Sequence, residues 1–384
     1  MSTPISLFDY HLPPENIAQA PVEPRDSSRL LVLDEREKGR KGEEREGKGS
    51  ESFTIEHRRF FEVVDYLESG DILVMNDTKV FKARLSGTVD GKTIEVFLLP
   101  SVGEGVEWKV LLKPGRKVKV GDKIFFGKIF AEVLEKFSDG TAKVAFDSST
   151  PPKGDWESKV ESQLSRDEVI SFANEYGSIP VPPYVKKVPD KFETYQTVYA
   201  RETGSVAAPT AGFHFTAELL EKIKEKGITI EFVTLHVGLG TFRPVKSETL
   251  EEHEMHSEFV EIKPEVAQRI NVAKVEGRRI VVVGTTTTRA LEGVALISKN
   301  SLSPDSYPLP SKGFFGEVNL FITPGFKFNV VDALITNFHL PKSTLLVLVS
   351  AFVGRENILA AYEEAIKLGY RFYSFGDAMF ICGV

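Results

Sequence analysis

The pattern of hydrophobic residues changes at Thr150, and this change constrains the fold more than any other feature of the sequence. Within residues 76–150, short β-rich runs such as VFKARLSGTV, KTIEVFLLP and EWKVLLKPG are separated by turn signals. Short strands at regular spacing predict a small antiparallel β-barrel. After Thr150, apolar strands alternate with amphipathic helices, which is typical of a layered α/β domain with a mixed or parallel sheet. We therefore expect an α/β fold that carries a second, all-β unit.

Several segments after Thr150 carry strand or helix signals. In TAELLEKIKEKG, Thr216 is a candidate N-cap and Gly227 a stop, and ITIEFVTLH then predicts a strand. RRIVVVG predicts a buried strand that leads into a helix in TTTTRALEGVAL, and ALITNFHLP predicts another strand. GRENILAAYEEAIKLG predicts an amphipathic helix that ends at Gly369. The longest apolar run, Thr344–Val353, predicts a buried strand or helix, because it is much shorter than the ~20 residues that cross a bilayer.

Composition excludes several classes of protein. The 384 residues are 41% hydrophobic, which is enough to bury a sizeable core in two domains or in one large domain with an insertion. A formal net charge of -7 argues against a general coat for DNA or membranes. The one cysteine, Cys382, cannot form an internal disulfide, a zinc knuckle or a cysteine-held iron–sulfur cluster within the chain. Because the N-terminus lacks the pattern of a signal peptide, we expect a cytoplasmic protein without a transmembrane segment.

A charged, glycine-rich run, EREKGRKGEEREGKGSE, lies between two apolar stretches that begin at Arg29 and Ser52. It has almost nothing to bury, so we interpret it as the loop of a hairpin. Its mixed charges could contact a nucleic acid, but a solvated turn of variable length explains them better.

The segment GSVAAPTAGFHFT contains the densest group of candidate site residues. Small residues let the backbone approach a ligand, phenylalanines offer stacking faces and a histidine titrates near neutral pH. The N-terminus of the helix that follows can bind an anionic group. The alternative is a tight turn around a core histidine. The candidates are Thr210, Gly212, Phe213, His214 and Phe215.

A second candidate loop, LHVGLGTFRP, follows a predicted strand, and ligands of open α/β sheets bind at strand ends. No third glycine follows at the required spacing and no helix begins there, so a Rossmann nicotinamide site is rejected. A loop in which the glycines only mark turns is the alternative. The candidates are His236, Gly238, Gly240, Thr241 and Arg243.

Two further strand ends carry polar side chains. GTTTTRALEG offers the hydroxyls of Thr285, Thr286 and Thr287 together with Arg289, which suit a ribose or a carboxylate. It is not a phosphate-binding P-loop, and threonines that cap a helix are the alternative. TNFHLPKST supplies Asn337 and His339.

Three histidines, His214, His236 and His339, therefore follow predicted strands or precede helices. Their common setting predicts a shared site in which histidine acts as acid or base. His253 and His256 lie among carboxylates but lack the spacing of a metal site, so we expect no metal.

Long motifs from nearly the whole chain resemble one family. They are VEPRDSSRLLVLD, GDILVMNDTKVFKARL, AAPTAGFHFT, LHVGLGTFRPV, HEMHSE, GTTTTRALE, VVDALITNFHLPKSTLLVLVSAF and YRFYSFGDAMFI. In this order they resemble the S-adenosylmethionine:tRNA ribosyltransferase-isomerases of queuosine biosynthesis. The resemblance implies a discontinuous α/β catalytic domain, residues 1–75 and 151–384, interrupted by an inserted β-barrel, residues 76–150.

The resemblance also implies the reaction. The ribosyl moiety of S-adenosylmethionine would be transferred and isomerised onto 7-aminomethyl-7-deazaguanine at the wobble position of tRNA, giving epoxyqueuosine in tRNA and releasing adenine and methionine. S-adenosylmethionine is then a consumed co-substrate, and no metal or redox cofactor is expected. We also expect a monomer that does not bind membranes.

Chemistry assigns roles to the candidates. The sulfonium acidifies the ribose 5′ carbon, so a base must remove that proton, and departure of adenine benefits from a proton donor. His214 and His339 are candidates for both roles, with His236 in reserve. Phe213 and Phe215 would stack on adenine or face the sulfonium. The methionine carboxylate or the ribose would be held by Arg243, Arg289 and the hydroxyls of residues 285–287.

The acceptor would be a single-stranded anticodon loop, approached by basic side chains. Residues 76–150 carry 13 lysines and arginines against 10 aspartates and glutamates, which makes the predicted barrel locally positive. A solvated barrel surface is the alternative. The candidate tRNA contacts are Arg25, Lys79, Lys82, Arg84, Arg116 and Lys117.

Two rival functions differ in what they predict. A tRNA-binding module without catalysis would gain no stability from S-adenosylmethionine. An ordinary methyltransferase would produce S-adenosylhomocysteine, but the glycine-rich turn and acidic strand end common in such folds are missing from the sequence.

Overall fold

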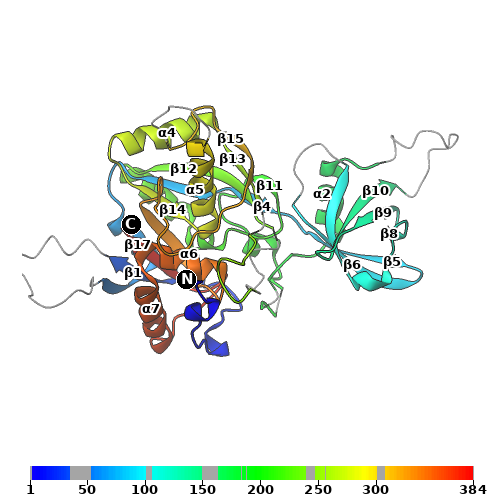
Figure 1. Ribbon diagram of the computed structural model, residues 1–384, viewed down its shortest axis with the longest axis horizontal. Coiled ribbons are helices and arrows are strands. Elements are labelled where there is room, and N and C mark those ends of the chain that lie inside the picture. The colour runs from blue at the N-terminus through cyan, green and yellow to red at the C-terminus, as the bar shows by residue number, and fades with distance from the viewer. Residues whose placement is uncertain are drawn as a thin grey trace, which may run out of the picture.

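The computed structural model describes residues 2–34, 53–100, 106–148, 163–182, 184–186, 188–238, 247–255, 257–300 and 308–383. Figure 1 shows a large α/β body and, to its right, a smaller β-rich unit joined to it by extended segments.

A nine-stranded mixed sheet forms the centre of the large body, in the order β15-β13-β12-β3-β14-β16-β17-β1-β2. The four strands β12, β3, β14 and β16 run parallel to one another, whereas β17 is antiparallel to β16 and β13 to β12. The prediction of a layered α/β domain with a mixed sheet is therefore confirmed. The strands are β1 (Arg29–Asp34), β2 (Thr54–Arg59), β3 (Ile72–Asn76), β12 (Thr229–His236), β13 (Glu258–Ile262), β14 (Ile280–Val283), β15 (Phe314–Val318), β16 (Ala333–Asn337) and β17 (Ala378–Cys382).

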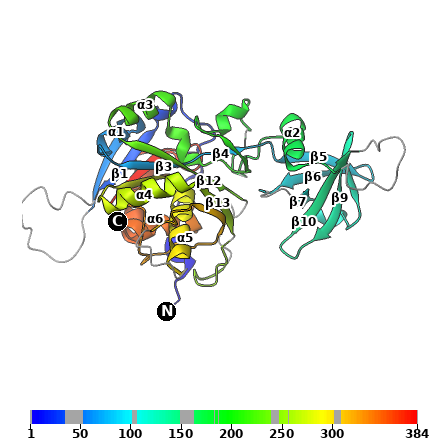
Figure 2. The same cartoon turned by 90° about the horizontal axis from the view of Figure 1, so that it is seen from above.

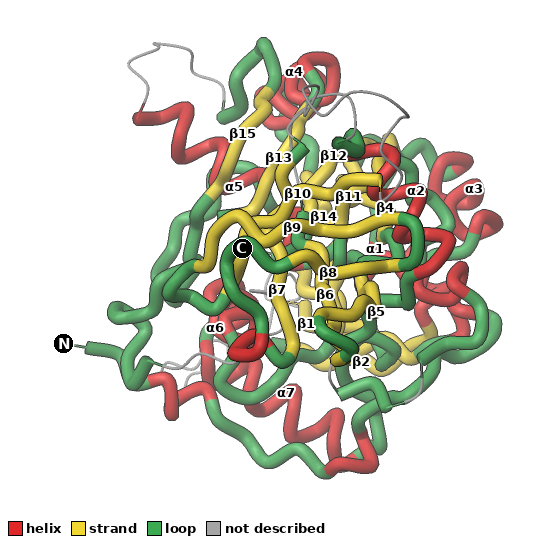
Figure 3. The backbone as a smooth tube through the Cα atoms, turned by 90° about the vertical axis from the view of Figure 1, so that its right-hand side faces the viewer, coloured by secondary structure: helices red, strands yellow, loops and turns green. Residues whose placement is uncertain are grey.

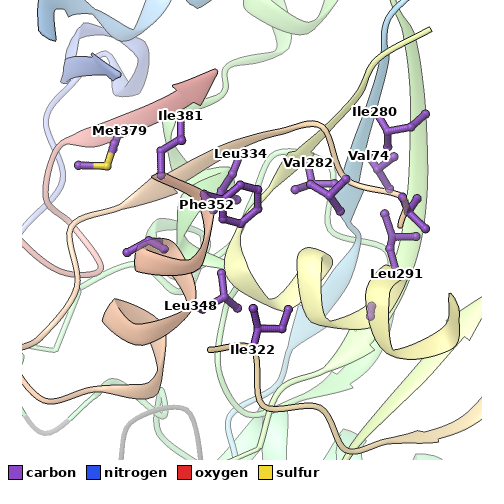
Figure 4. Packing of buried hydrophobic residues seen from close by; sticks show 14 of the residues in the cluster. Val74, Ile280, Val282, Leu291, Ile322, Leu334, Leu348, Phe352, Met379 and Ile381 are labelled. Carbon is purple, nitrogen blue, oxygen red and sulfur yellow. The ribbon is translucent and has the colours of Figure 1, made fainter. Parts of the chain in front are cut away.

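Helices cover both faces of this sheet, as Figure 2 shows from above. Successive strand residues point to opposite faces, so Leu73 and Met75 of β3 pack under α1 and α3, while Ile72 and Val74 belong to the core on the other face. Figure 4 shows that second core, where Val74 and Val282 lie near Leu291 of α5. The helices are α1 (Val63–Tyr66), α3 (Ala217–Glu225), α4 (Pro264–Val275), α5 (Thr285–Asn300), α6 (Thr344–Val353) and α7 (Arg355–Lys367).

Local signals in the sequence account for several of these elements. The side chain of Thr216 accepts a hydrogen bond from the N–H of Leu219 (3.1 Å) and caps α3, as predicted, and Gly227 follows the helix with a φ of +84°. The strands β1 and β2 pair antiparallel and so form the predicted hairpin, whereas its charged loop lies outside the described residues.

The apolar run Thr344–Val353 is a helix, α6. Among the described residues, no single helix is long and apolar enough to cross a membrane; α6 and α7 reach that length and composition only as a pair, bent by 111° at its break.

Six antiparallel strands form the smaller unit, which Figure 3 shows from the side on which it lies. They pair in the order β7-β6-β5-β8-β9-β10, and β10 also pairs with β7. Their inner side chains, among them Trp108 and Phe146, are buried in one hydrophobic core. The strands are β5 (Arg84–Val89), β6 (Lys92–Leu98), β7 (Glu107–Lys113), β8 (Lys123–Phe126), β9 (Ile129–Lys136) and β10 (Thr141–Ser148).

The structure moves both expected boundaries of this unit. Asn76 ends β3 in the large sheet, and β4 (Thr78–Val80) pairs in parallel with β11 (Glu202–Ser205), so the unit begins only after Val80. Beyond residue 150, helix α2 (Arg166–Tyr176) buries its apolar face in the core of the six strands. The sequence pattern places the boundary where the β-rich runs end. The unit to which an amphipathic helix belongs depends instead on where its apolar face packs.

Short 3₁₀ turns complete the chain and include the segment that carries His214. They are Ile5–Phe8, Pro14–Asn16, Arg25–Ser27, Phe60–Glu62, Gly115–Lys117, Phe192–Tyr195 and Thr210–His214.

Candidate active site

A cavity opens at the carboxyl ends of the parallel strands β12, β14 and β16. This is the edge of an open α/β sheet where ligands bind. It is lined by Tyr184, Ala208, Pro209, Thr210, Ala211, Val237, Gly284, Thr285, Thr286, Thr336, Asn337, Phe338, His339, Leu340, Ser343, Leu345, Tyr373 and Ser374.

The wall of this cavity contains hydroxyls, an amide, an imidazole and aromatic rings, but no Asp, Glu, Lys or Arg among the described lining residues. Thr285 and Thr286 stand at the first turn of α5, where N–H groups lack intrahelical partners and favour an anion. Gly284 turns the chain from β14 into this helix with a φ of +90°, a conformation that favours glycine. Thr287 points away, because its Oγ1 donates to the carbonyl of Val283 (2.6 Å).

His339 lies in the cavity wall two residues after β16. Its ring Nε2 is 3.0 Å from the hydroxyl of Thr336. Its main chain is held on both sides: the N–H donates to the hydroxyl of Tyr362 (2.9 Å), and the carbonyl accepts from the hydroxyl of Tyr10. Burial lowers the pKa of His339 from 6.5 to about 3, so the ring is neutral at pH 7.

His214 lies behind the cavity wall, linked to it through Asn337. The Nδ2 atom of Asn337 is 3.1 Å from His214 Nε2 and 3.2 Å from the carbonyl oxygen of Tyr373, while Asn337 Oδ1 is 3.3 Å from the hydroxyl of Thr210. His214 Nδ1 is 2.8 Å from the hydroxyl of Ser28. Burial, and then the charges of nearby arginines, lower the pKa of His214 to about 3.

His236 does not belong to this site. Its Nδ1 is 2.8 Å from the hydroxyl of Thr78 and its ring stacks near Phe259, and neither the histidine nor these partners line the cavity. Burial lowers the pKa of His236 to about 4. Of the three histidines expected to share a site, the structure thus places only His339 in the cavity wall, and Val237, the residue after His236, lines the cavity.

The phenylalanines of the first motif are packing residues. Phe215 is fully buried and meets Phe60 edge to face in the core under α3. Phe213 stacks against Phe375 and borders a smaller neighbouring cavity, which also includes His214 and Ser374. Neither phenylalanine lines the main cavity.

Gly212 also serves packing. A Cβ atom placed there would come within 1.9 Å of the hydroxyl of Tyr199, so only glycine fits. Of this motif, only Thr210 among the predicted residues lines the main cavity.

Arg289 is buried and paired within the fold. Its side chain forms an ion pair with Glu258 of β13, in which both side chains are only 6% exposed, and its Nε donates to the carbonyl of Leu320 (3.0 Å). Gly238 is described but does not line the cavity. Gly240, Thr241, Arg243 and His256 lie outside the described residues.

The predicted tRNA contacts come from both parts of the molecule, and two of them, Arg25 and Lys82, meet the segment 192–196. Arg25 is partly buried over the ring of Phe213 and donates to main-chain carbonyls of residues 193, 194 and 196; burial lowers its pKa. Lys79 is exposed on β4, outside the six-stranded unit.

The remaining basic candidates lie in or beside the six-stranded unit. Lys82 lies over the ring of Phe192, and Arg84 lies over Phe97 with Glu95 3.6 Å away. Arg116 and Lys117 are exposed on the turn between β7 and β8.

Tyr184, Tyr373 and Ser374 line the cavity, although sequence reasoning gave them no role. The two tyrosine rings are 4.6 Å apart, and the hydroxyls of Tyr184 and Ser374 are 2.6 Å apart. Tyr373 has a φ of +72°, which is uncommon for any residue but glycine and often marks a functional site. The available signal was the motif YRFYSFGDAMFI, whose YSFG turn precedes a buried strand.

No group of three or more His, Cys, Asp or Glu side chains in the described ranges is arranged to hold a metal ion. His253, one of the two histidines considered for a metal, instead meets Phe321 edge to face.

Comparison with known proteins gives matches over nearly the full length. A family model described as queuosine biosynthesis protein matches residues 5–381. A Staphylococcus haemolyticus protein named S-adenosylmethionine:tRNA ribosyltransferase-isomerase is 48% identical over 381 residues, which are 98% of this chain and 99% of that protein. The crystal structure of S-adenosylmethionine tRNA ribosyltransferase from Thermotoga maritima matches with 37% identity and a TM-score of 0.50, covering 98% of this chain and 99% of that one.

The buried histidines predict that the folded protein loses stability in acid. Their pKa values in the fold, about 3 for His214 and His339 and about 4 for His236, lie below the ordinary 6.5, so the unfolded chain binds protons first. Stability is complete above pH 6.5 and falls as the pH drops from there toward 4. Urea unfolding measures how much the free energy of unfolding falls between pH 7.5 and pH 5.0. This fall should be smaller for His339→Gln than for the unchanged protein, by up to about 1.4 kcal/mol per pH unit. Equal losses would contradict a buried neutral His339.

Proposed function

This chain belongs to the queuosine biosynthesis protein family, and from that premise we propose that the cavity at the strand ends binds S-adenosylmethionine as a ribosyl donor. The chain is an S-adenosylmethionine-dependent tRNA ribosyltransferase-isomerase. The acceptor is the aminomethyl group of 7-aminomethyl-7-deazaguanine at the tRNA wobble position. The transfer converts this nucleoside to epoxyqueuosine and releases adenine and methionine.

One observation carries the proposal for the cavity: it lacks charged side chains among its described lining residues, yet it combines two tyrosine rings with a helix N-terminus. A sulfonium is a cation that aromatic faces attract, most strongly where water is excluded. The methionine carboxylate is an anion that the first N–H groups of α5 favour. Tyr184 and Tyr373 thus take the role first expected of Phe213 and Phe215.

Hydroxyl groups around the cavity suit the ribose. Thr210, Thr285, Thr286 and Ser374 each offer a donor and an acceptor. The helix amides of α5 replace Arg289 as the proposed site for the carboxylate, because that arginine is already paired with Glu258.

The overall reaction is redox neutral, since adenine and methionine leave S-adenosylmethionine without electrons from outside. We therefore propose that no metal or redox cofactor takes part and that S-adenosylmethionine is consumed as a co-substrate. We further propose that the protein works as a monomer in the cytoplasm and binds no membrane.

For tRNA, we propose that the six-stranded unit is a closed barrel and contacts the anticodon loop. Pairing of β10 with β7 supports closure. The exposed Arg116 and Lys117 supply positive charge on a turn of this unit, and basic side chains neutralise phosphates.

The reaction itself is tested with pure protein, S-adenosylmethionine and tRNA that carries 7-aminomethyl-7-deazaguanine. Mass spectrometry should detect adenine and methionine in equal amounts and a ribosyl-derived mass on the wobble base, and tRNA with guanine at that position serves as the control. S-adenosylhomocysteine as product would instead indicate a methyltransferase. Tight tRNA binding without any turnover would indicate a binding module.

Recognition of the sulfonium predicts a specific effect of Tyr184. Replacing its ring with an aliphatic side chain, Tyr184→Leu, should weaken S-adenosylmethionine binding about 5- to 30-fold, because a desolvated cation–π contact contributes about 1–2 kcal/mol. Binding of S-adenosylhomocysteine, which has no sulfonium, should change less than about threefold. Titration calorimetry with both ligands measures this, and Tyr184→Phe is the matched control that keeps the ring. Equal losses for the two ligands would refute the aromatic role.

Charge reversal at Arg116 and Lys117 predicts weaker tRNA binding. The double variant to Glu should lower the affinity at least about tenfold and reduce the slope of log affinity against log salt by roughly 1–2, because fewer counterions are released. Exposed lysines of the large body, Lys222 and Lys367, reversed together provide a control of equal charge change. Unchanged affinity and slope in the Arg116/Lys117 variant would remove this turn from the interface.

A further inference from the structure

Two histidines lie at or behind the cavity wall, and their hydrogen bonds give them different capacities. We propose that His339 takes the C5′ proton of bound S-adenosylmethionine and passes it to the departing adenine, whereas His214 is a positioning residue that orients Asn337. This inference rests on the proposed ribosyl transfer and assigns both proton transfers to one residue.

The amide of Asn337 fixes the state of His214. A carbonyl oxygen can only accept, so the Asn337 atom that lies 3.2 Å from the carbonyl of Tyr373 is the nitrogen. The same nitrogen therefore donates to His214 Nε2 (3.1 Å), which must carry no proton. In the neutral ring the proton then sits on Nδ1 and is donated to the hydroxyl of Ser28 (2.8 Å).

His214 consequently has no nitrogen available for substrate. Both ring nitrogens are occupied, the ring is stacked on Phe60 at 4.9 Å, and the residue does not line the main cavity. His214 instead accepts a hydrogen bond from Asn337. Together with the carbonyl of Tyr373 and the hydroxyl of Thr210, it holds the Asn337 amide in one orientation in the cavity wall.

His339 differs on each of these points. It lines the cavity, only its Nε2 is occupied, by the hydroxyl of Thr336, and its Nδ1 has no hydrogen-bond partner within the described ranges. The tyrosine hydroxyls of residues 10 and 362 hold its main chain from both sides. A base that is rigidly held and has one open nitrogen is prepared for proton transfer before the substrate arrives.

The proposed steps balance. His339 Nδ1 accepts the proton from C5′, and the electron pair of the broken C–H bond stays on carbon beside the sulfonium. Adenine leaves with the electron pair of its glycosidic bond and takes the proton from the imidazolium. His339 thus returns to its neutral state, and no other acid or base is required for these two transfers.

Matched glutamine variants separate the two roles. In His339→Gln the side-chain amide keeps a partner for Thr336 but has no basic nitrogen, so adenine release should fall roughly 10²–10⁴-fold with S-adenosylmethionine affinity nearly unchanged. In His214→Gln the amide oxygen still accepts from Asn337, so release should fall less than about tenfold. His214→Ala removes that acceptor and should be slower than His214→Gln. Single-turnover adenine release and calorimetry measure these effects.

Chemical rescue keeps the test decisive if a glutamine variant folds poorly. Added imidazole should restore adenine release to His339→Ala and not to His214→Ala, and the rescued rate should fall when C5′ carries deuterium. Rescue of His214→Ala alone, no rescue of a folded His339→Ala that binds S-adenosylmethionine, or near-normal turnover of His339→Gln would each overturn the assignment. If the unchanged protein releases no adenine, the proposed function fails instead.

Discussion

Burial of the central sheet on both faces is the constraint on which the site depends. Every residue of β3, β14, β16 and β17 is buried, so polar side chains in these strands can meet a ligand only where the strands end. The parallel strands β12, β14 and β16 place their carboxyl ends at one edge, and the cavity opens there. At the opposite end of β16, the buried carboxylate of Glu292 on α5 accepts the N–H groups of residues 329–331 and so fixes where this strand begins. The position of Asn337 and His339 thus follows from the core.

Within that edge, hydrogen bonding decides which polar residues remain available for chemistry. Buried polar groups are nearly always paired, and Arg25, Arg289 and His214 have their polar atoms directed to carbonyls, a carboxylate and side chains of the fold itself. They resemble substrate ligands in the sequence because arginine and histidine have the same chemistry in either setting. Only the partners in the folded structure distinguish an arginine that is paired within the fold from one that can bind a substrate carboxylate. None of these three residues lines the cavity.

Local rules therefore predicted the fold better than the site. The cap at Thr216, the hairpin of β1 and β2 and the strand ends of β14 and β16 were visible because each depends on a few neighbouring residues. The membership of α2 in the smaller unit was not, since it depends on packing across the chain. The same limit applies to the cavity: Thr285, Thr286, Asn337 and His339 were predicted at strand ends and Thr210 in a loop before a helix. Tyr184 and Tyr373, in contrast, approach from loops whose path no periodicity encodes.

A neutral cavity also suits the charge balance of the proposed chemistry. Desolvation is the cause that lowers the pKa of His339 to about 3, because an imidazolium would be a cation without water. Bound S-adenosylmethionine already brings a cation there, so proton transfer from C5′ replaces one buried cation by another and the desolvation cost largely cancels. A carboxylate in the wall would instead form an ion pair with the sulfonium, stabilising the ground state more than the transition state and slowing the reaction. The lack of acidic side chains in the described wall is thus a condition that favours deprotonation by a neutral histidine.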